Sequence, residues 1–229
     1  MSLHLQHEID DLKQKLLRMA GLAETAVNRA MQALLTRNPA LAEQVKEEDD
    51  ALDQLECELD ELAIQLLAKA PLASDLRLIT AAMKISRDLE RVGDEATTIA
   101  RRASDLALEP PLPIPAELSR LLHLALEMLA QALDCFVNQE AASARSIPPR
   151  DKEADQLHKT VQAGLLELMQ RDPSTVTRAT RLMTTSKSLE RIADHAANIA
   201  EDVVYLCEAL DIRHPKKVVG RGDGRSESQ

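Results

Sequence analysis

The sequence predicts an all-α protein built from two tandem, pseudo-symmetric three-helix bundles. Aromatic residues make up only 1% of the 229 residues, so the core has to come from Leu, Ala, Ile, Val and Met, a composition that favours helices over sheets. Apolar residues recur at steps of three and four along almost the whole chain, which is the period of an amphipathic helix. The segments ERVGDEATTIA and ERIADHAANIA begin at Glu90 and Glu190, so one motif occurs in both halves of the chain.

Three amphipathic stripes make up the first half. Apolar residues follow the helical period over residues 5–33, 45–66 and 89–106. The segment RNPA separates the first two stripes, and KAPLAS separates the second from the third. Pro71 ends one helix because it cannot continue the backbone hydrogen bonds, and Ser74 can help start the next. The first unit is therefore predicted to consist of three long helices joined by short turns.

The densest proline segment, EPPLPIP, follows this unit. After it, helices are expected over residues 116–143, over residues 150–171 and from there to residue 212, with breaks at SIPP and RDPS. The predicted organisation is a first repeat at 1–108, a stiff linker at 109–115, a second repeat at 116–212 and a tail at 213–229. The tail is rich in Gly and polar residues, so it has too little apolar surface to fold and is expected to be disordered.

Direct alignment of the two halves supports an internal duplication. MKISRDLERVGDEATTIARR and MTTSKSLERIADHAANIAED share nine identities over twenty positions. Acidic residues four positions apart recur in these segments and in the helices that precede them. The complete set consists of four acid pairs: Asp49 and Asp53, Glu90 and Asp94, Asp151 and Asp155, and Glu190 and Asp194.

The spacing of the acid pairs points to metal binding. Acids at positions i and i+4 share one helical face, where like charges repel unless a positive group compensates. Counted from the expected turns, the two pairs of each unit lie at nearly the same height on antiparallel helices and point away from the apolar stripe. Each unit would then present four carboxylates at its surface, which suits oxygen-preferring cations such as iron, manganese, magnesium or calcium. The alternative of ordinary solvated faces stays open, because 29% of the residues are charged.

Other chemistry has little support in the sequence. A net charge of −10 argues against a nucleic-acid or anionic-membrane surface. The six glycines form no phosphate-binding loop, and no Ser or Cys nucleophile has a convincing base beside it. A ferritin-like site requires Glu-x-x-His motifs, and only Asp155 with His158 comes near. The remaining histidines are expected to be surface or satisfied residues, with His195 the best candidate ligand because it follows Asp194. We therefore expect that the protein is not an enzyme.

The sequence also predicts a cytoplasmic protein. Its start is polar and periodic, and no apolar run approaches the roughly 18 residues of a membrane span, so neither a signal peptide nor membrane insertion is expected. Cys57, Cys135 and Cys207 are odd in number and far apart, which suits free thiols in a reducing compartment.

Five segments resemble, in order, those of the PhoU family of phosphate-uptake regulators. They are EEDDALDQLECELDE (47–61), PLASDLRLI (71–79), LERVGDEA (89–96), RDKEADQ (150–156) and LERIADHAANI (189–199). The resemblance covers the chain from about residue 5 to about residue 212. It implies two pseudo-symmetric three-helix bundles that bind divalent or ferric ions (iron, zinc, manganese or magnesium) through the eight acidic residues named above.

The resemblance also implies a function. A protein of this family acts as a negative regulator of phosphate uptake and of the phosphate-starvation response. It would be a metal-binding adaptor between the ATPase subunit of the phosphate ABC transporter and a sensor histidine kinase, and a homodimer is expected. The alternatives are a paralogue or metal-binding helical scaffold that controls another transporter, and a metal-dependent enzyme or iron store.

Overall fold

The structure is a computed structural model that describes residues 3–69 and 72–212. Within these residues it is helical and contains no strand, which confirms the predicted all-α class. The long helices are α1 (Leu3–Thr36), α2 (Pro39–Leu67), α3 (Ala73–Ala107), α4 (Ala116–Asn138), α6 (Asp151–Arg171) and α7 (Val176–Glu208). The short elements are α5 (Ala141–Ala144) and the 3-10 turns η1 (Pro148–Arg150) and η2 (Pro173–Thr175). The predicted tail lies outside the described residues.

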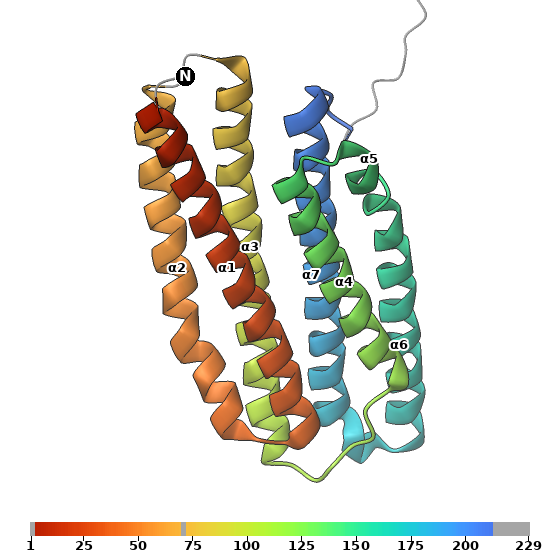
Figure 1. Ribbon diagram of the computed structural model, residues 1–229. Helices are drawn as coiled ribbons and strands as arrows, with labels where there is room; N and C mark the ends of the chain where they lie inside the picture. Colours follow the sequence, from red (N-terminus) through yellow and green to blue (C-terminus); the bar gives the residue numbers. More distant parts are fainter. Residues whose placement is uncertain (1–2, 70–71, 213–229) are drawn as a thin grey trace, which may run out of the picture.

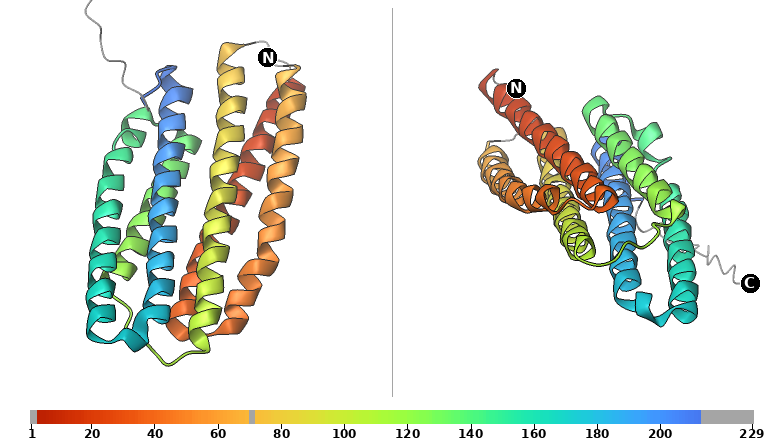
Figure 2. Two further views of the ribbon diagram at one scale, coloured as in Figure 1. Left: turned by 180° about the vertical axis from the view of Figure 1, so that it is seen from behind. Right: turned by 90° about the horizontal axis from the view of Figure 1, so that it is seen from below.

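The helices form two three-helix bundles that lie side by side (Figure 1). Helices α1, α2 and α3 pack on one another, as do α4, α6 and α7. The bundles meet chiefly along α3 and α7, which run beside each other through the centre of the molecule (Figure 2). Helix α2 flanks α3 and helix α6 flanks α7, while α1 and α4 cover one side of this row. Helices α3 and α7 consequently each pack against helices of both bundles.

Apolar stripes hold each bundle together. Leu16 of α1, Leu59 of α2 and Leu89 of α3 are fully buried in the first bundle, as are Met128 of α4 and Ile192 of α7 in the second. Burying one such side chain is worth about 1.5–3 kcal/mol. Helices of this length gain most of their stability from such packing rather than from intrinsic propensity, so the positions of the stripes determine which faces remain for polar residues.

The helix expected at 116–143 ends earlier than predicted. Helix α4 stops at Asn138 because Gln139 has the left-handed backbone conformation, with a φ of 55°. The Glu140 N–H then donates to the Cys135 carbonyl at 3.0 Å, which satisfies one of the acceptors that a helix end leaves open. Glycine usually occupies this conformation, so a glutamine there leaves no visible stop signal in the sequence. The chain continues through α5 and η1 before α6 begins.

Helix α3 begins close to the predicted place, but Ser74 does not cap it. The helix begins at Ala73 and follows Leu72, which makes no side-chain capping hydrogen bond. Ser74 lies within the first turn, where its Oγ donates to Asp75 Oδ1 at 3.5 Å instead of capping the helix. Pro71, the predicted end of the preceding helix, lies outside the described residues.

The expectation that no segment is long and apolar enough to cross a membrane is wrong for one of the described helices. Helix α4 meets this criterion by length and composition. However, 56% of its most apolar window is buried inside the structure, because the helix packs against α6 and α7. The core helix of a soluble protein meets the same criterion, so this is weak support for a membrane span.

Ion pairs run along the contact between α3 and α7. Each pair joins one residue of the first bundle to one of the second. Together the pairs favour one register of α3 along α7. The pairs are Lys84 Nζ with Asp202 Oδ1 at 2.9 Å, Asp88 Oδ1 with His195 Nδ1 at 2.8 Å, and Glu95 Oε1 with Arg191 Nη1 at 3.0 Å.

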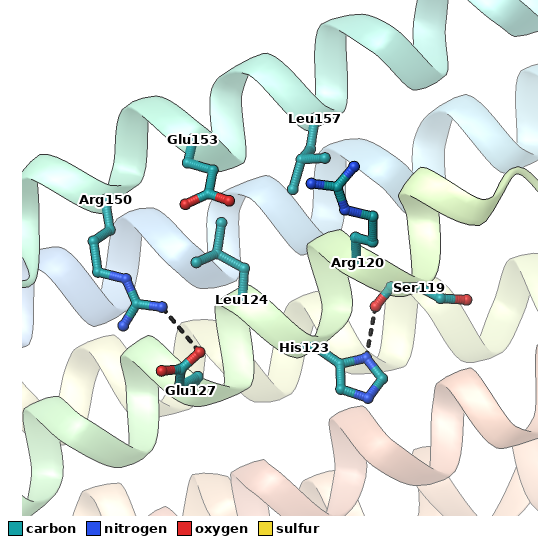
Figure 3. A pocket seen from close by; sticks show the side chains of 8 residues that line it. All are labelled: Ser119, Arg120, His123, Leu124, Glu127, Arg150, Glu153 and Leu157. Carbon is teal, nitrogen blue, oxygen red and sulfur yellow. Dashed lines mark hydrogen bonds and ion pairs between the residues drawn. The ribbon is translucent and has the colours of Figure 1, made fainter.

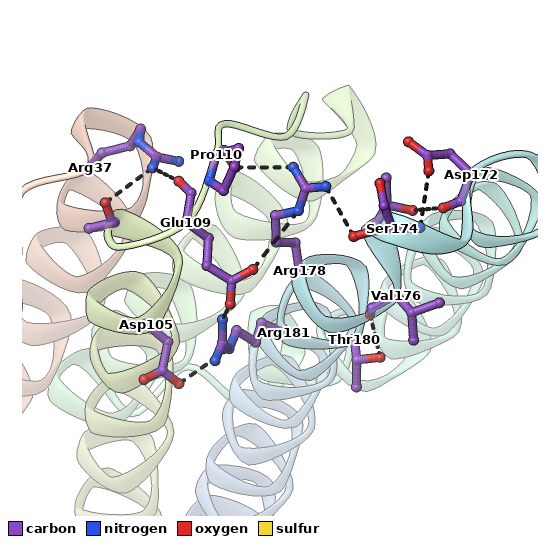
Figure 4. Close-up of polar contacts among 12 residues, drawn as sticks. Arg37, Asp105, Glu109, Pro110, Asp172, Ser174, Val176, Arg178, Thr180 and Arg181 are labelled. Carbon is purple, nitrogen blue, oxygen red and sulfur yellow. Dashed lines mark hydrogen bonds and ion pairs between the residues drawn. The ribbon is translucent and has the colours of Figure 1, made fainter.

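A second polar network joins the bundles where the linker leaves α3 (Figure 4). Arg37, at the end of α1, donates to the backbone carbonyl of Glu109. The Glu109 carboxylate pairs with Arg181 of α7, whose Nε also lies 3.5 Å from Asp105 Oδ2. Arg178 Nε lies 4.0 Å from the same Glu109 carboxylate. We call these five residues the linker clasp, because they connect α1, α3, the linker and α7.

Candidate metal-binding site

The eight predicted ligands fall into two groups of four. Asp49 and Asp53 of α2 lie beside Glu90 and Asp94 of α3, and we call these four the first carboxylate cluster. The second carboxylate cluster consists of Asp151 and Asp155 of α6 with Glu190 and Asp194 of α7. Within each group, charges on one helix raise the pKa of carboxyl groups on the other.

Repulsion in the first cluster is only partly compensated. Burial is the main cause of a raised pKa at Asp49, and the charges of Asp53 and Asp94 add to it. The pKa of Glu90 is also raised, first by burial and then by Asp94. Arg91 supplies positive charge to the acids of α3, since its Nη1 lies 2.9 Å from Asp94 Oδ2 and its Nε lies 3.3 Å from Glu90 Oε2.

Gly93 allows α2 to approach α3 closely at the first cluster. A Cβ at this position would lie 2.6 Å from Leu52 Cδ1 and 3.2 Å from Asp49 Oδ1. The first distance is too short for an ordinary van der Waals contact. The equivalent residue in the second bundle is Ala193, so the two clusters have different helix contacts beneath them.

In the second cluster, Asp151 has a strongly raised pKa. Burial, followed by the charges of Asp194 and Asp155, raises the pKa of Asp151 from 3.8 to about 6. Asp151 Oδ1 is buried and has no hydrogen-bond partner among the described residues. Lys187 forms an ion pair with Glu190, and it lowers the pKa of Asp151 less than the neighbouring acids raise it. The cluster therefore holds a carboxylate oxygen that the described side chains leave unsatisfied.

The clusters are less exposed than the sequence predicted. The exposed fraction of the side chain is 16% for Glu90 and 13% for Glu190, against 47% for Asp94 and 45% for Asp155. Each glutamate lies on the face that packs against a neighbouring helix of its own bundle, since Glu90 interacts with Asp53 of α2 and Glu190 with Asp151 of α6. Each cluster thus combines one enclosed glutamate with aspartates that range from partly buried to exposed, and the expected placement on an open surface is only partly right.

The predicted ligand set left out Glu56 and His158, which lie one further turn along the same stripes. Glu56 of α2 has a pKa raised by burial and then by Asp60 and Asp53, and its charge also raises the pKa of Glu90. His158 of α6 is buried, and burial lowers its pKa. Both follow an acid pair at the i+7 position, so a search for polar residues with helical spacing would have found them.

His195, the strongest histidine candidate from sequence, is used elsewhere. Its Nδ1 lies 2.8 Å from Asp88 Oδ1, across the contact between α3 and α7. It therefore joins the two bundles, although its neighbour Asp194 belongs to the second cluster. The ferritin-like alternative gains no support, since the described residues show one buried histidine, His158, beside only one of the clusters.

The donor set of both clusters fits an oxygen-preferring cation. Carboxylates at matched heights, a buried unpartnered oxygen at Asp151 and the small residue Gly93 beside Asp49 are all compatible with such an ion. As the side chains stand, no three His, Cys, Asp or Glu of residues 3–69 and 72–212 converge closely enough to hold a metal ion. Coordination would therefore require the carboxylates to rotate about their side-chain bonds. Metal binding by these eight residues stays a prediction.

A separate cleft of about 390 Å³ lies between α4 and α6 (Figure 3). Arg150 extends into it and bonds to Glu127 Oε2 at 2.9 Å and to Gln131 Oε1 at 2.8 Å. None of the eight predicted ligands lines this cleft, whose lining residues are Ser119, Arg120, His123, Leu124, Glu127, Arg150, Glu153 and Leu157. It is therefore distinct from both carboxylate clusters.

Comparison with known proteins identifies the family. The PhoU domain model matches residues 16–103 and again residues 118–203. A curated relative from Pseudomonas aeruginosa, named phosphate-specific transport system accessory protein PhoU homolog, is 42% identical over 90% of this chain and 86% of its own length. A relative of the same name from Aquifex aeolicus is 36% identical over 90% of this chain and 94% of its own length.

Solved structures agree with the sequence comparison. The crystal structure of PhoU from Pseudomonas aeruginosa has a TM-score of 0.85 at 40% identity, covering 90% of this chain and 99% of that one. The PhoU structure from Streptococcus pneumoniae, a phosphate transport system regulatory protein, has a TM-score of 0.85 at 29% identity, covering 91% and 99%. Because both halves match the domain model and the relatives align over nearly their full length, the chain belongs to the PhoU family.

Proposed function

We propose that this protein is an accessory regulator of a phosphate-specific transport system, which lowers phosphate uptake and silences the phosphate-starvation response when phosphate is plentiful. The observation that carries the proposal is the match of both bundles to the PhoU domain, together with relatives named as accessory proteins of that system. The names of the relatives state neither negative regulation nor the individual partners, so both are part of the proposal.

In its proposed role the protein is a cytoplasmic adaptor. One partner is the ATPase subunit of the phosphate ABC transporter, and the other is the sensor histidine kinase of the starvation response. Two bundles of the same fold with different surface residues support binding of two partners, since specificity depends on the residues rather than the fold. For example, exposed Arg101 of α3 corresponds to Glu201 of α7. A homodimer would present both surfaces twice.

Metal ions would serve to stabilise the helix pairs that carry these surfaces. A cation held by the first or the second carboxylate cluster would remove the repulsion that raises the pKa of Asp49, Glu90 and Asp151. Asp88 and Glu95, which pair with α7, lie on either side of the acid pair of α3. A small shift of α3 relative to α2 would therefore also move the residues of α3 that form ion pairs with α7.

Uptake of radiolabelled phosphate tests this function. A strain that lacks the gene should take up phosphate faster in phosphate-rich medium than the parent strain, and the wild-type gene should restore the lower rate. A gene that encodes Glu90→Gln together with Asp94→Asn should restore the low rate only partly. Equal uptake in the parent and deletion strains would contradict the proposed regulation.

A further inference from the structure

The second carboxylate cluster has a histidine where the first has a glutamate. His158 lies three residues after Asp155 on α6, and Glu56 lies three residues after Asp53 on α2, so the two occupy equivalent positions of the duplicated bundles. The charges of Glu190 and Asp155 act on the ring of His158. Next to the four carboxylates of each cluster there is therefore one further polar side chain, which is an imidazole in the second bundle and a carboxylate in the first.

The His158 ring is held by one of its two nitrogens. Its Nδ1 lies 2.9 Å from Ser186 Oγ, and the residue is 7% exposed. The described part of the chain provides no hydrogen-bond partner for Nε2. A partner at one ring nitrogen fixes the orientation of the ring and leaves the other nitrogen available as a ligand, which is how metal-binding histidines are commonly supported.

The equivalent serine of the first bundle is used differently. Ser86 Oγ donates to the Met83 carbonyl of its own helix at 2.9 Å, and the residue of α2 equivalent to His158 is Glu56. Ser186 makes its hydrogen bond to His158 instead. The second bundle thus differs from the first in one residue, His158 in place of Glu56, and in the hydrogen-bond partner of the equivalent serine.

We propose that His158 is a nitrogen ligand of the second carboxylate cluster, and that the two clusters consequently differ in metal preference. The first cluster, with Glu56, offers only oxygen and suits hard ions such as Mn²⁺ or Mg²⁺. The second offers imidazole nitrogen as well, which raises its preference for Zn²⁺ over Mn²⁺. This inference rests on the proposed metal binding by the eight carboxylates.

A simpler explanation is that His158 is a core histidine satisfied by Ser186 alone. That explanation accounts for Nδ1 but not for the position of the ring near the carboxylates of Glu190 and Asp155. The same cluster contains a buried polar atom without a hydrogen bond among the described residues, Asp151 Oδ1. A cation between Nε2 and the carboxylates would give Asp151 Oδ1 a partner, whereas a purely structural histidine would not.

Proteins that retain one cluster allow the preference to be measured. Glu90→Gln with Asp94→Asn leaves the second cluster intact, and Glu190→Gln with Asp194→Asn leaves the first. The purified full chain is stripped with EDTA and titrated with Zn²⁺ or Mn²⁺ in competition with a chromophoric chelator. We expect the ratio of Zn²⁺ to Mn²⁺ affinity to be about tenfold or more higher for the second cluster than for the first.

Substitution of His158 then identifies the ligand. His158→Asn keeps a polar group near the Nδ1 position and removes Nε2. In the protein that retains only the second cluster, it should weaken Zn²⁺ binding about tenfold or more and Mn²⁺ binding much less. His123→Asn is the matched control, because His123 is exposed on α4 and lines the separate cleft. Circular dichroism melting curves without metal show that each variant is folded.

X-ray absorption at the zinc edge gives a readout that a structural role would not affect. The second-cluster protein should show imidazole scattering, and this signal should disappear in His158→Asn but persist in His123→Asn. If Zn²⁺ binds without imidazole scattering, or binds equally well to His158→Asn, the assignment of His158 is wrong while the carboxylate clusters stand. If neither cluster binds Zn²⁺ or Mn²⁺, the proposed metal binding and the role of His158 both fall.

Discussion

Replacing Asp151 by Asn tests the electrostatic description of the second carboxylate cluster. Burial, and after it the charges of Asp194 and Asp155, raises the pKa of Asp151 from 3.8 to about 6. A shift of about 2 pKa units corresponds to about 3 kcal/mol of unfavourable free energy for the ionised form. Because the side chain is only partly buried, solvent screening reduces this value, and we expect a cost of about 1 kcal/mol.

The direction of the pH dependence follows from the raised pKa. The folded protein binds the Asp151 proton more tightly than the unfolded chain does, so this group lowers stability as the pH rises from 3.8 to about 6. Asn carries no charge at any pH. In EDTA, Asp151→Asn should therefore exceed the wild type in free energy of unfolding by about 1 kcal/mol at pH 7 and match it near pH 4.

Added metal should reverse this order. With excess Mn²⁺ the wild type retains the complete carboxylate set and gains stability from binding, whereas Asp151→Asn has lost one ligand and gains less. Unfolding followed by circular dichroism between pH 4 and pH 8, with EDTA or with Mn²⁺, measures both effects. For a chain of this length, about 1 kcal/mol corresponds to a shift of about 2–4 °C in Tm.

Asp134→Asn provides the control, because Asp134 is an exposed aspartate of α4 and belongs to neither cluster. Its stability difference from the wild type should not change when Mn²⁺ replaces EDTA. The reasoning would be refuted if Asp151→Asn were less stable than the wild type at pH 7 in EDTA, because the carboxylate would then have a favourable partner in the folded state.

Two further substitutions test the helix contacts. Gly93→Ala should lower the free energy of unfolding by about 1 kcal/mol, because the added Cβ would overlap Leu52 Cδ1 at 2.6 Å. Gly21→Ala, which meets nothing within 4 Å, should instead raise it by about 0.5–1 kcal/mol through helix propensity, and equal effects of the two would contradict the close contact of α2 with α3. Arg181→Ala removes two ion pairs of the linker clasp and should cost about 1–3 kcal/mol. The control, Arg171→Ala, breaks only an exposed ion pair within α6 and should cost less than about 0.5 kcal/mol. Thermal unfolding measures both variants. If Arg181→Ala were as stable as Arg171→Ala, the linker clasp would not stabilise the fold.

The grouping of the acid pairs could be predicted because it depends only on helix geometry. A helix rises about 1.5 Å per residue, so residues at similar distances from a short turn lie at similar heights on the two helices that it joins. Asp53 and Glu90, on either side of the α2–α3 turn, illustrate this. The enclosure of Glu90 could not be predicted in the same way, because it depends on how closely α2 packs against α3 at Gly93.

Other features depend on contacts that the sequence pattern does not contain. The pairing of Asp88 with His195 joins residues 107 positions apart, and an amphipathic stripe does not show which bundle faces will meet. The end of α4 depends on a glutamine in a conformation that glycine usually marks. The di-iron motif does not predict His158 as a ligand, because the motif is incomplete in this sequence. The helical spacing does place His158 on the acidic stripe of α6.

Output of a phosphate-starvation promoter in phosphate-rich medium tests the central claim most directly. The promoter is measured in a strain that lacks this gene, and again after restoring either the wild type or a variant with Glu90→Gln, Asp94→Asn, Glu190→Gln and Asp194→Asn. We predict that deletion switches the promoter on, that the wild type silences it, and that the variant, although folded, silences it incompletely. A promoter that stays silent in the deletion strain, with the transporter and the kinase intact, would contradict the regulatory role.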